Sequence, residues 1–139
     1  MGIVSTAKAE WKGSLKEGSG EVDFSGFKGS YTFASRFETG KGTNPEELIA
    51  AAHAGCYSMQ LSGLLTAAGT PPTDIKTTAK VEIVAGKGIT SIALETVGRV
   101  PGIDEATFVA AAEKAKEICP VSQALKSVPS VTLKATFAK

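Results

Sequence analysis

The two cysteines of this chain, Cys56 and Cys119, are its best candidates for chemistry. Cys56 lies inside a long uncharged segment, and Cys119 directly precedes Pro120. Neither belongs to a CxxC pair or to a cluster of metal-ligating residues, and the chain has one histidine. Two thiols that lie far apart in the sequence without such partners favour reversible thiol chemistry between them.

Because the thiolate is the nucleophile, the question is what lowers the pKa of each cysteine. Pro120 suits the first position of a short helix that runs to Lys126, which puts Cys119 at its N-cap, near the positive end of the helix dipole. Cys56 lies too far into its own helix for that effect and needs a cation. Lowering a thiol pKa from about 8.5 to about 6 requires roughly 3.4 kcal/mol, and one charge near 4 Å supplies about 4 kcal/mol at an effective dielectric of about 20.

The nearest cation before this helix that lies outside a turn is Arg36. A buried arginine needs a carboxylate, preferably in bidentate contact. Glu47 falls at the third helical position if Asn44 is the N-cap, where it is explained as a capping residue. Glu46 is therefore the freer partner for Arg36.

Glu46 and Cys56 are ten positions apart, a rise of about 15 Å along one helix, so they cannot share a site on that helix. An antiparallel copy of the helix that crosses near Ala51 would bring Glu46 of one chain opposite Cys56 of the other. The alanines around Ala51, together with Gly55, are small enough for a close crossing. The spacing predicts a two-fold dimer with composite sites.

The pattern before this helix predicts β-structure, with a Gly-rich turn at residues 17–20. The expected strands are Lys8–Leu15, Glu21–Phe27 and Ser30–Glu38. In the last of these, alternation places the aromatic side chains on one face and Arg36 on the other. The central helix is expected to begin at Asn44-Pro45 and to end at Gly69.

The second half predicts another hairpin, two helices and a final strand. The expected elements are strands Asp74–Val84 and Ile89–Val100, a helix Glu105–Ile118 capped by Asp104, a short helix from Pro120, and a strand Val131–Phe137. This order predicts an α+β fold with an antiparallel β-sheet, in one domain over residues 1–139.

Composition excludes some classes of function. Lys+Arg 15 against Asp+Glu 14 gives a net charge of +1, which provides no basic surface for nucleic acid. The stretch from Leu48 to Gly69 has no charged residue, but its polar side chains favour a central helix, buried by the sheets and by a partner, over a membrane span. Residues Met1–Gly13 lack the apolar core of a secretory signal, so we expect a cytoplasmic protein.

Three segments together resemble the OsmC/Ohr family of thiol peroxidases. They are Thr43-Asn44-Pro45-Glu46-Glu47-Leu48-Ile49-Ala50-Ala51-Ala52-His53-Ala54-Gly55-Cys56, Ser35-Arg36-Phe37-Glu38 upstream, and Ile118-Cys119-Pro120-Val121-Ser122-Gln123-Ala124-Leu125 downstream. The arginine in Arg-Phe-Glu resembles the OsmC branch in particular. The resemblance covers nearly the whole chain, and it implies an intertwined homodimer with long buried central helices that reduces organic hydroperoxides.

By the same resemblance, Cys56 would be the peroxidatic cysteine and Cys119 the resolving cysteine. Arg36 would stabilise the thiolate, and Glu46 would be its carboxylate partner. The implied mechanism is attack of Cys56 on the peroxide, formation of a sulfenic acid, and closure of a Cys56–Cys119 disulfide that a dithiol reduces. The resemblance implies a dihydrolipoyl-type reductant in some members. This chemistry needs neither a metal nor an organic cofactor.

Three alternatives compete with this interpretation. His53 lies one helical turn before Cys56, which would allow a Cys/His acyl hydrolase. Cys56, His53 and Cys119 together have the ligand number of a catalytic zinc site, though without a fixed spacing. A dimer with an apolar crevice could also bind a lipid-like ligand without catalysis.

Overall fold

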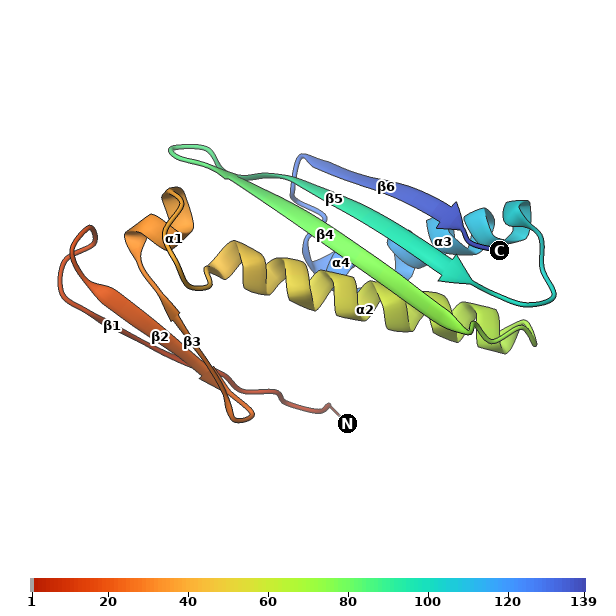
Figure 1. The fold of residues 1–139 in the computed structure, drawn as a ribbon, viewed down its shortest axis with the longest axis horizontal. Coiled ribbons are helices and arrows are strands. Elements are labelled where there is room, and N and C mark those ends of the chain that lie inside the picture. The colour runs from red at the N-terminus through yellow and green to blue at the C-terminus, as the bar shows by residue number, and fades with distance from the viewer. Residues whose placement is uncertain (1) are drawn as a thin grey trace. The chain divides into compact units, whose positions relative to one another are not determined.

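The computed structural model describes residues 2–139 and divides into two units, one that ends at Leu48 and one from Ile49 to Lys139. Figure 1 shows the order of helices and strands along the chain. Met1, where the segment considered as a possible signal begins, lies outside the described residues. Whether residues 1–139 form one domain stays a prediction. Each unit is described by itself below.

The first unit contains an antiparallel sheet with the strand order β1-β2-β3. Its strands are β1 (Lys8–Lys12), β2 (Ser19–Phe24) and β3 (Phe27–Tyr31). Ser25 and Gly26 both have positive φ and join paired Phe24 and Phe27 in a two-residue hairpin, where right-handed strand twist favours such a turn. The strand expected over residues 8–15 ends at Lys12. The strand expected over residues 21–27 instead covers 19–24, and Phe27 begins the next strand.

The strand expected at Ser30–Glu38 is wrong beyond Tyr31, because helix α1 (Phe33–Phe37) begins there. Thr32 and Ser35 form a capping box: the Ser35 N–H donates to Thr32 Oγ1 at 3.1 Å, and the Thr32 N–H donates to Ser35 Oγ at 2.8 Å. These bonds satisfy backbone groups at the helix start. The Arg36 guanidinium lies 5.2 Å from the Phe37 ring, so Arg36 also does not point away from the aromatic side chains.

The long helix α2 (Pro45–Ala67) begins where the sequence predicts. Asn44 Oδ1 accepts the Glu47 N–H at 2.7 Å, as an N-cap should. One face of α2 is buried along most of its length. The buried residues on this face lie four positions apart: His53, Tyr57, Leu61 and Leu65. Another face of the same helix is exposed in the single chain, with Met59 at 79% exposure. Across residues 2–139, no helix combines the length and the apolar character that a membrane crossing requires.

The second unit contains a mixed sheet with the strand order β4-β5-β6. Strands β4 (Asp74–Val84) and β5 (Gly88–Arg99) pair antiparallel, whereas β6 (Ser130–Phe137) runs parallel to β5. The prediction of a purely antiparallel sheet is therefore wrong. Helices α3 (Glu105–Ile118) and α4 (Pro120–Ala124) connect β5 to β6, and such a helical crossover is what allows two strands to pair in parallel.

Helices α2 and α3 pack along this mixed sheet (Figure 1). The buried hydrophobic residues of the described chain all come from the second unit: Tyr57, Leu61, Leu65, Ile92, Leu94, Val100, Phe108, Ala112, Ala115 and Cys119. The Tyr57 hydroxyl donates to the Ala112 carbonyl at 2.9 Å, which ties α2 to α3 inside the core. One of the two candidate cysteines is thus a core residue.

Candidate active site

The second unit brings the two cysteines together. Cys56 on α2 and Cys119 between α3 and α4 place their Sγ atoms 3.0 Å apart, and both are free thiols. A disulfide would shorten this separation to about 2.05 Å. Cys119 is fully buried, whereas Cys56 is partly exposed. Of the two sulfurs, Cys56 is therefore the one that a molecule from solution can reach.

The Cys119-Pro120 pair sets the position of the buried sulfur. Cys119 ends α3, where its N–H donates to the Ala115 carbonyl at 2.9 Å, and the next residue begins α4. Its ψ of 123° is extended, as the steric demand of a following proline requires. Cys119 makes no regular capping bond, but its sulfur lies near the N–H groups of Val121 and Ser122. The predicted break in the helix is confirmed.

The surroundings shift the pKa values of the two thiols in opposite directions. Burial raises the pKa of Cys56, and its hydrogen bond with Cys119 raises it further. Burial also acts to raise the pKa of Cys119, but its hydrogen bonds with Cys56, Ser122 and the Val121 backbone outweigh it, so the net pKa of Cys119 is lowered. Burial thus works against a Cys56 thiolate in the single chain.

His53 contacts Ser122 and makes no hydrogen bond to Cys56. Its Nε2 lies 2.6 Å from Ser122 Oγ, while Nδ1 is buried with no hydrogen-bond partner among the described residues. This geometry gives a Cys/His hydrolase no base at its nucleophile. Within residues 2–139, His, Cys, Asp and Glu side chains form no group of three that could hold a metal ion, so the zinc alternative finds no ligand set.

Ser122 is the residue of this cluster that sequence reasoning missed. It stands three positions after the N-cap Cys119, at the helical position whose side chain commonly reaches back toward the cap. That spacing is the one signal that could have identified it. A serine in the first turn of a short helix is otherwise easily explained as a turn former.

The first unit brings Arg36 and Glu46 together in a bidentate ion pair. Arg36 Nε donates to Glu46 Oε1 and Nη2 donates to Oε2, each at 3.0 Å. The hydrogen bonds to Glu46 raise the pKa of Arg36 further, so its charge is permanent. The Glu46 side chain is 6% exposed and that of Arg36 is 38% exposed, so the carboxylate is the fixed, buried half of the pair.

Hydrogen bonds between α1 and the start of α2 hold this pair in place. Ser35 Oγ donates to the Thr43 carbonyl at 2.8 Å, and Asn44 Nδ2 donates to the Ser35 carbonyl at 3.0 Å. Ser35 is buried, so these bonds form away from bulk water. They place Arg36, at the end of the short helix α1, opposite the first turn of α2.

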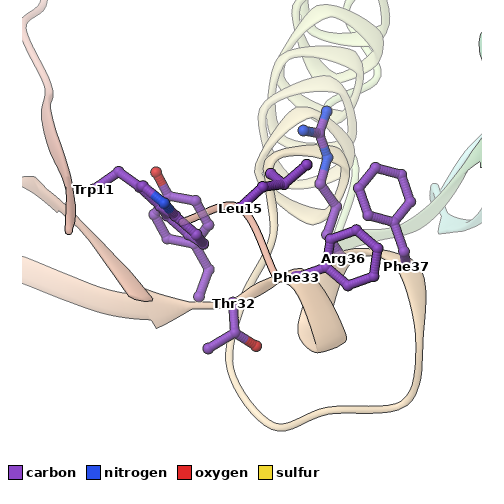
Figure 2. A pocket seen from close by; sticks show the side chains of 7 residues that line it. Trp11, Leu15, Thr32, Phe33, Arg36 and Phe37 are labelled. Carbon is purple, nitrogen blue, oxygen red and sulfur yellow. The ribbon is translucent and has the colours of Figure 1, made fainter. Parts of the chain in front are cut away.

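Arg36 lines a mostly apolar pocket of about 230 Å³ (Figure 2). It is lined by Trp11, Leu15, Tyr31, Thr32, Phe33, Arg36 and Phe37. The rings of Phe33 and Phe37 pack at 5.1 Å between centroids, and those of Trp11 and Tyr31 at 5.4 Å. One permanent charge in an aromatic pocket suits a ligand with a polar end and a hydrocarbon body.

The family model described as OsmC-like protein matches residues 38–134. The chain belongs to the OsmC family. It is 51% identical over 133 residues to Peroxiredoxin OsmC of Escherichia coli strain K12, and the match covers 91% of this chain and 93% of that relative. It is 33% identical over 95 residues to the organic hydroperoxide resistance protein of Xanthomonas axonopodis pv. citri, and the match covers 68% of this chain and 67% of that relative.

A solved structure shares this OsmC fold. The crystal structure of an OsmC-like protein from Mycoplasma pneumoniae superposes with a TM-score of 0.77 at 17% identity, and the match covers 100% of both chains. The family resemblance that the cysteine motifs indicate is confirmed, and so is the α+β class of the fold.

Proposed function

We propose that this OsmC-family chain is a thiol-dependent peroxidase that reduces organic hydroperoxides, with Cys56 as the peroxidatic and Cys119 as the resolving cysteine. The single observation that carries the proposal is the 3.0 Å contact between a partly exposed and a fully buried thiol. A protein named peroxiredoxin and one named for organic hydroperoxide resistance are the relatives that support it.

In the first step the Cys56 thiolate attacks a peroxide oxygen. A sulfur–oxygen bond forms as the oxygen–oxygen bond breaks, and the departing alkoxide takes a proton and leaves as the alcohol. In the second step Cys119 attacks the Cys56 sulfenic acid. The sulfur–sulfur bond forms, and the hydroxyl leaves as water with the proton of the Cys119 thiol. An external dithiol then reduces the disulfide.

Arg36 supplies the cation that Cys56 lacks in its own unit, and Glu46 holds Arg36 in position. This assignment is supported by the raised pKa of Cys56 and by the two bonds that fix the guanidinium. A guanidinium near the sulfur stabilises the thiolate and the negative charge that develops on the leaving oxygen.

Two copies of the chain form an intertwined homodimer in which Arg36 and Glu46 of one chain serve Cys56 of the other. Support comes from the ten positions between Glu46 and Cys56, a rise of about 15 Å on α2. It also comes from the exposed face of α2, where Ala51 and Gly55 leave room for a second helix and Met59 is an apolar side chain left in water.

The aromatic pocket around Arg36 favours hydroperoxides with a hydrocarbon body over hydrogen peroxide. Each buried CH₂ contributes about 0.8 kcal/mol, so an aryl hydroperoxide gains binding that hydrogen peroxide cannot. A dihydrolipoyl-type reductant and a cytoplasmic location stay predictions from the family resemblance and from the sequence.

The function is tested by mixing the reduced protein with an alkyl hydroperoxide and following free thiols and alcohol together by stopped flow. We expect both thiols to disappear as one disulfide within the chain, with one alcohol released for each disulfide. Thiols that stay reduced under these conditions would favour the lipid-binding alternative instead.

The shared site is tested by subunit exchange between Cys56→Ser and Arg36→Ala chains, each inactive alone. In a shared-site heterodimer one site collects both defects and the other is intact. Activity should therefore return, to about half that of the wild-type dimer. If no activity returns after proven exchange, each chain carries its own complete site, and the composite dimer is wrong while the peroxidase assignment stands.

A further inference from the structure

A line of polar contacts runs from His53 to the buried sulfur of Cys119, entirely within the second unit. His53 Nε2 lies 2.6 Å from Ser122 Oγ, and the Ser122 side chain hydrogen-bonds to the Cys119 thiol. His53 and Cys119 have no exposed surface, whereas Ser122 between them is partly exposed. The mechanism described above leaves both His53 and Ser122 without a role.

The unpartnered Nδ1 of His53 fixes the direction of this line. Burial lowers the pKa of His53, so the ring is neutral at pH 7 and carries one proton. A proton on Nδ1 would be a buried donor without an acceptor, and orphaned N–H groups are rarer in proteins than unsatisfied acceptors. The proton therefore belongs on Nε2, which donates to Ser122 Oγ. The Ser122 hydroxyl then turns its own proton toward Cys119.

We infer that His53 is a positioning residue for the resolving step: by donating to Ser122 it holds the Ser122 hydroxyl as a hydrogen-bond donor to Cys119, and so speeds closure of the disulfide. The inference rests on the proposed roles of Cys56 and Cys119. Reduction of the hydroperoxide by Cys56 does not depend on it.

The chemical reason lies in the form of Cys119 that attacks. The Cys119 thiolate attacks the sulfur of the Cys56 sulfenic acid: the sulfur–sulfur bond forms, the sulfur–oxygen bond breaks, and the departing hydroxide takes up the proton that Cys119 gave up and leaves as water. A donor on the Cys119 sulfur stabilises that thiolate inside an apolar core. Raising a thiol pKa two units above ambient pH lowers its thiolate fraction about 100-fold, and the higher nucleophilicity recovers about tenfold of this. If loss of the Ser122 donor leaves the Cys119 pKa two units above ambient pH, closure should slow about tenfold.

Several titratable groups lie around this cluster. Cys56 faces Cys119 from α2, and so does Tyr57, whose pKa is raised by burial so that its hydroxyl stays neutral. Glu113 acts on Tyr57 from α3, and Lys116, Glu117 and Lys126 line a pocket with Ser122. His53 stays neutral at pH 7 and above. We expect the effect of the Ser122 donor on closure to follow the titration of the two thiols.

The test separates the two steps of one turnover in the full-length protein. Reduced protein is mixed with one equivalent of an aryl hydroperoxide. Alcohol release then reports the first step, and the disulfide, or sulfenic acid trapped by a dimedone-type probe, reports the second. We expect Ser122→Ala and His53→Leu to slow disulfide closure about tenfold at pH 7, with alcohol release unchanged.

Three further readouts distinguish positioning from a merely structural role. The deficit in closure should shrink as pH rises above the thiol pKa of the variant. His53→Gln, whose side-chain N–H can replace Nε2–H, should restore most of the rate. The double variant Ser122→Ala with His53→Leu should be no slower than Ser122→Ala alone, because His53 acts only through Ser122.

Ser58→Ala is the matched control, since Ser58 also donates a side-chain hydrogen bond from α2, to Thr77 Oγ1 at 2.8 Å. It should leave closure unchanged. Closure at the wild-type rate in Ser122→Ala would overturn the inference, as would equal slowing of both steps at every pH. If His53→Leu does not fold, Ser122→Ala and His53→Gln carry the test. A wild-type chain that releases no alcohol would instead overturn the proposed function, and this inference with it.

Discussion

In the unit that ends at Leu48 the proposed site residues are a charged pair, whereas in the unit from Ile49 they are two neutral thiols against a hydrophobic core. Arg36 and Glu46 are held by two charge-assisted hydrogen bonds at 3.0 Å, with the Arg36 side chain 38% exposed. Cys119 is fully buried among apolar side chains. Charge is easily maintained in the first setting and costly in the second.

On the proposed roles of Arg36 and Cys56, this difference means that neither unit suffices alone. In the second unit the two sulfurs already lie in contact, which favours closing a disulfide. Burial there raises the pKa of Cys56, which works against its thiolate. The first unit has the missing charge, yet none of the hydrophobic side chains among its residues 2–48 is buried in the single chain. Such a unit gains stability by covering its apolar side chains with another surface, which an intertwined dimer would provide.

The largest effects should come from the sulfurs themselves. Cys56→Ser should abolish hydroperoxide reduction, since the sequence has one other cysteine, Cys119, and it is buried. With one equivalent of hydroperoxide, Cys119→Ser should release one alcohol per chain and leave Cys56 as sulfenic acid; excess hydroperoxide should oxidise Cys56 further, with release of more alcohol. Mass spectrometry of the intact chain after one equivalent of hydroperoxide distinguishes these products. If Cys56→Ser reacts and Cys119→Ser does not, the two roles are reversed.

Arg36→Ala should have the next largest effect, on the first step alone. If Arg36 holds the Cys56 pKa near 6, and its loss returns that pKa to the ordinary thiol value of about 8.5 or above, the thiolate fraction at pH 7 falls at least about 30-fold. The rate of alcohol release should fall by that factor and recover as pH rises above about 8.5. Arg36→Lys should recover only part of the rate, because lysine cannot match the bidentate contact with Glu46. A deficit that stays constant up to high pH would exclude thiolate stabilisation as the role of Arg36.

A smaller effect is expected from the apolar wall of the Arg36 pocket. Phe33→Ala removes an aromatic side chain that lines it, and should lower kcat/KM for an aryl hydroperoxide about tenfold, with little change for hydrogen peroxide. Phe27→Ala is the matched control, because Phe27 lies in the same unit, is 67% exposed and does not line this pocket. Equal loss toward both peroxides in Phe33→Ala would mean that the pocket does not bind the hydrocarbon part of the substrate.

The parts of the fold and site that follow from the sequence are those set by local rules. Asn44-Pro45 fixes the start of α2, and Cys119-Pro120 breaks one helix and begins the next, because both signals act on the backbone of adjacent residues. The partnership of Arg36 with Glu46 also follows from a short-range argument, since a partly buried guanidinium needs a carboxylate.

What the sequence could not give depends on longer-range structure. The five residues of α1 are too few for helical periodicity, and their alternating aromatic side chains imitate a strand. The parallel direction of β6 is set by the helical crossover before it, and alternation within a strand is the same in either direction. The contact between His53 and Ser122 joins elements far apart in the chain, so it becomes visible only once the helices are packed.

The smallest predicted effect sharpens the comparison by measuring the cost of charge in the second unit. Burial lowers the pKa of His53 below the value of about 6.5 for an exposed imidazole. At a pH between the pKa of His53 in the folded chain and its pKa in the unfolded chain, the unfolded chain binds a proton that the folded chain does not. The contribution of His53 to the free energy of unfolding is thus fully present above about pH 6.5. It is lost as pH falls toward the pKa of His53 in the folded chain, by at most about 1.4 kcal/mol per pH unit.

Denaturant unfolding at fixed protein concentration should show this slope between pH 7 and 5. The chain has one histidine, so His53→Gln should flatten the slope while Ser122→Ala retains it. Parallel curves for wild type and His53→Gln would show that the imidazole is protonated as easily in the folded chain as in water.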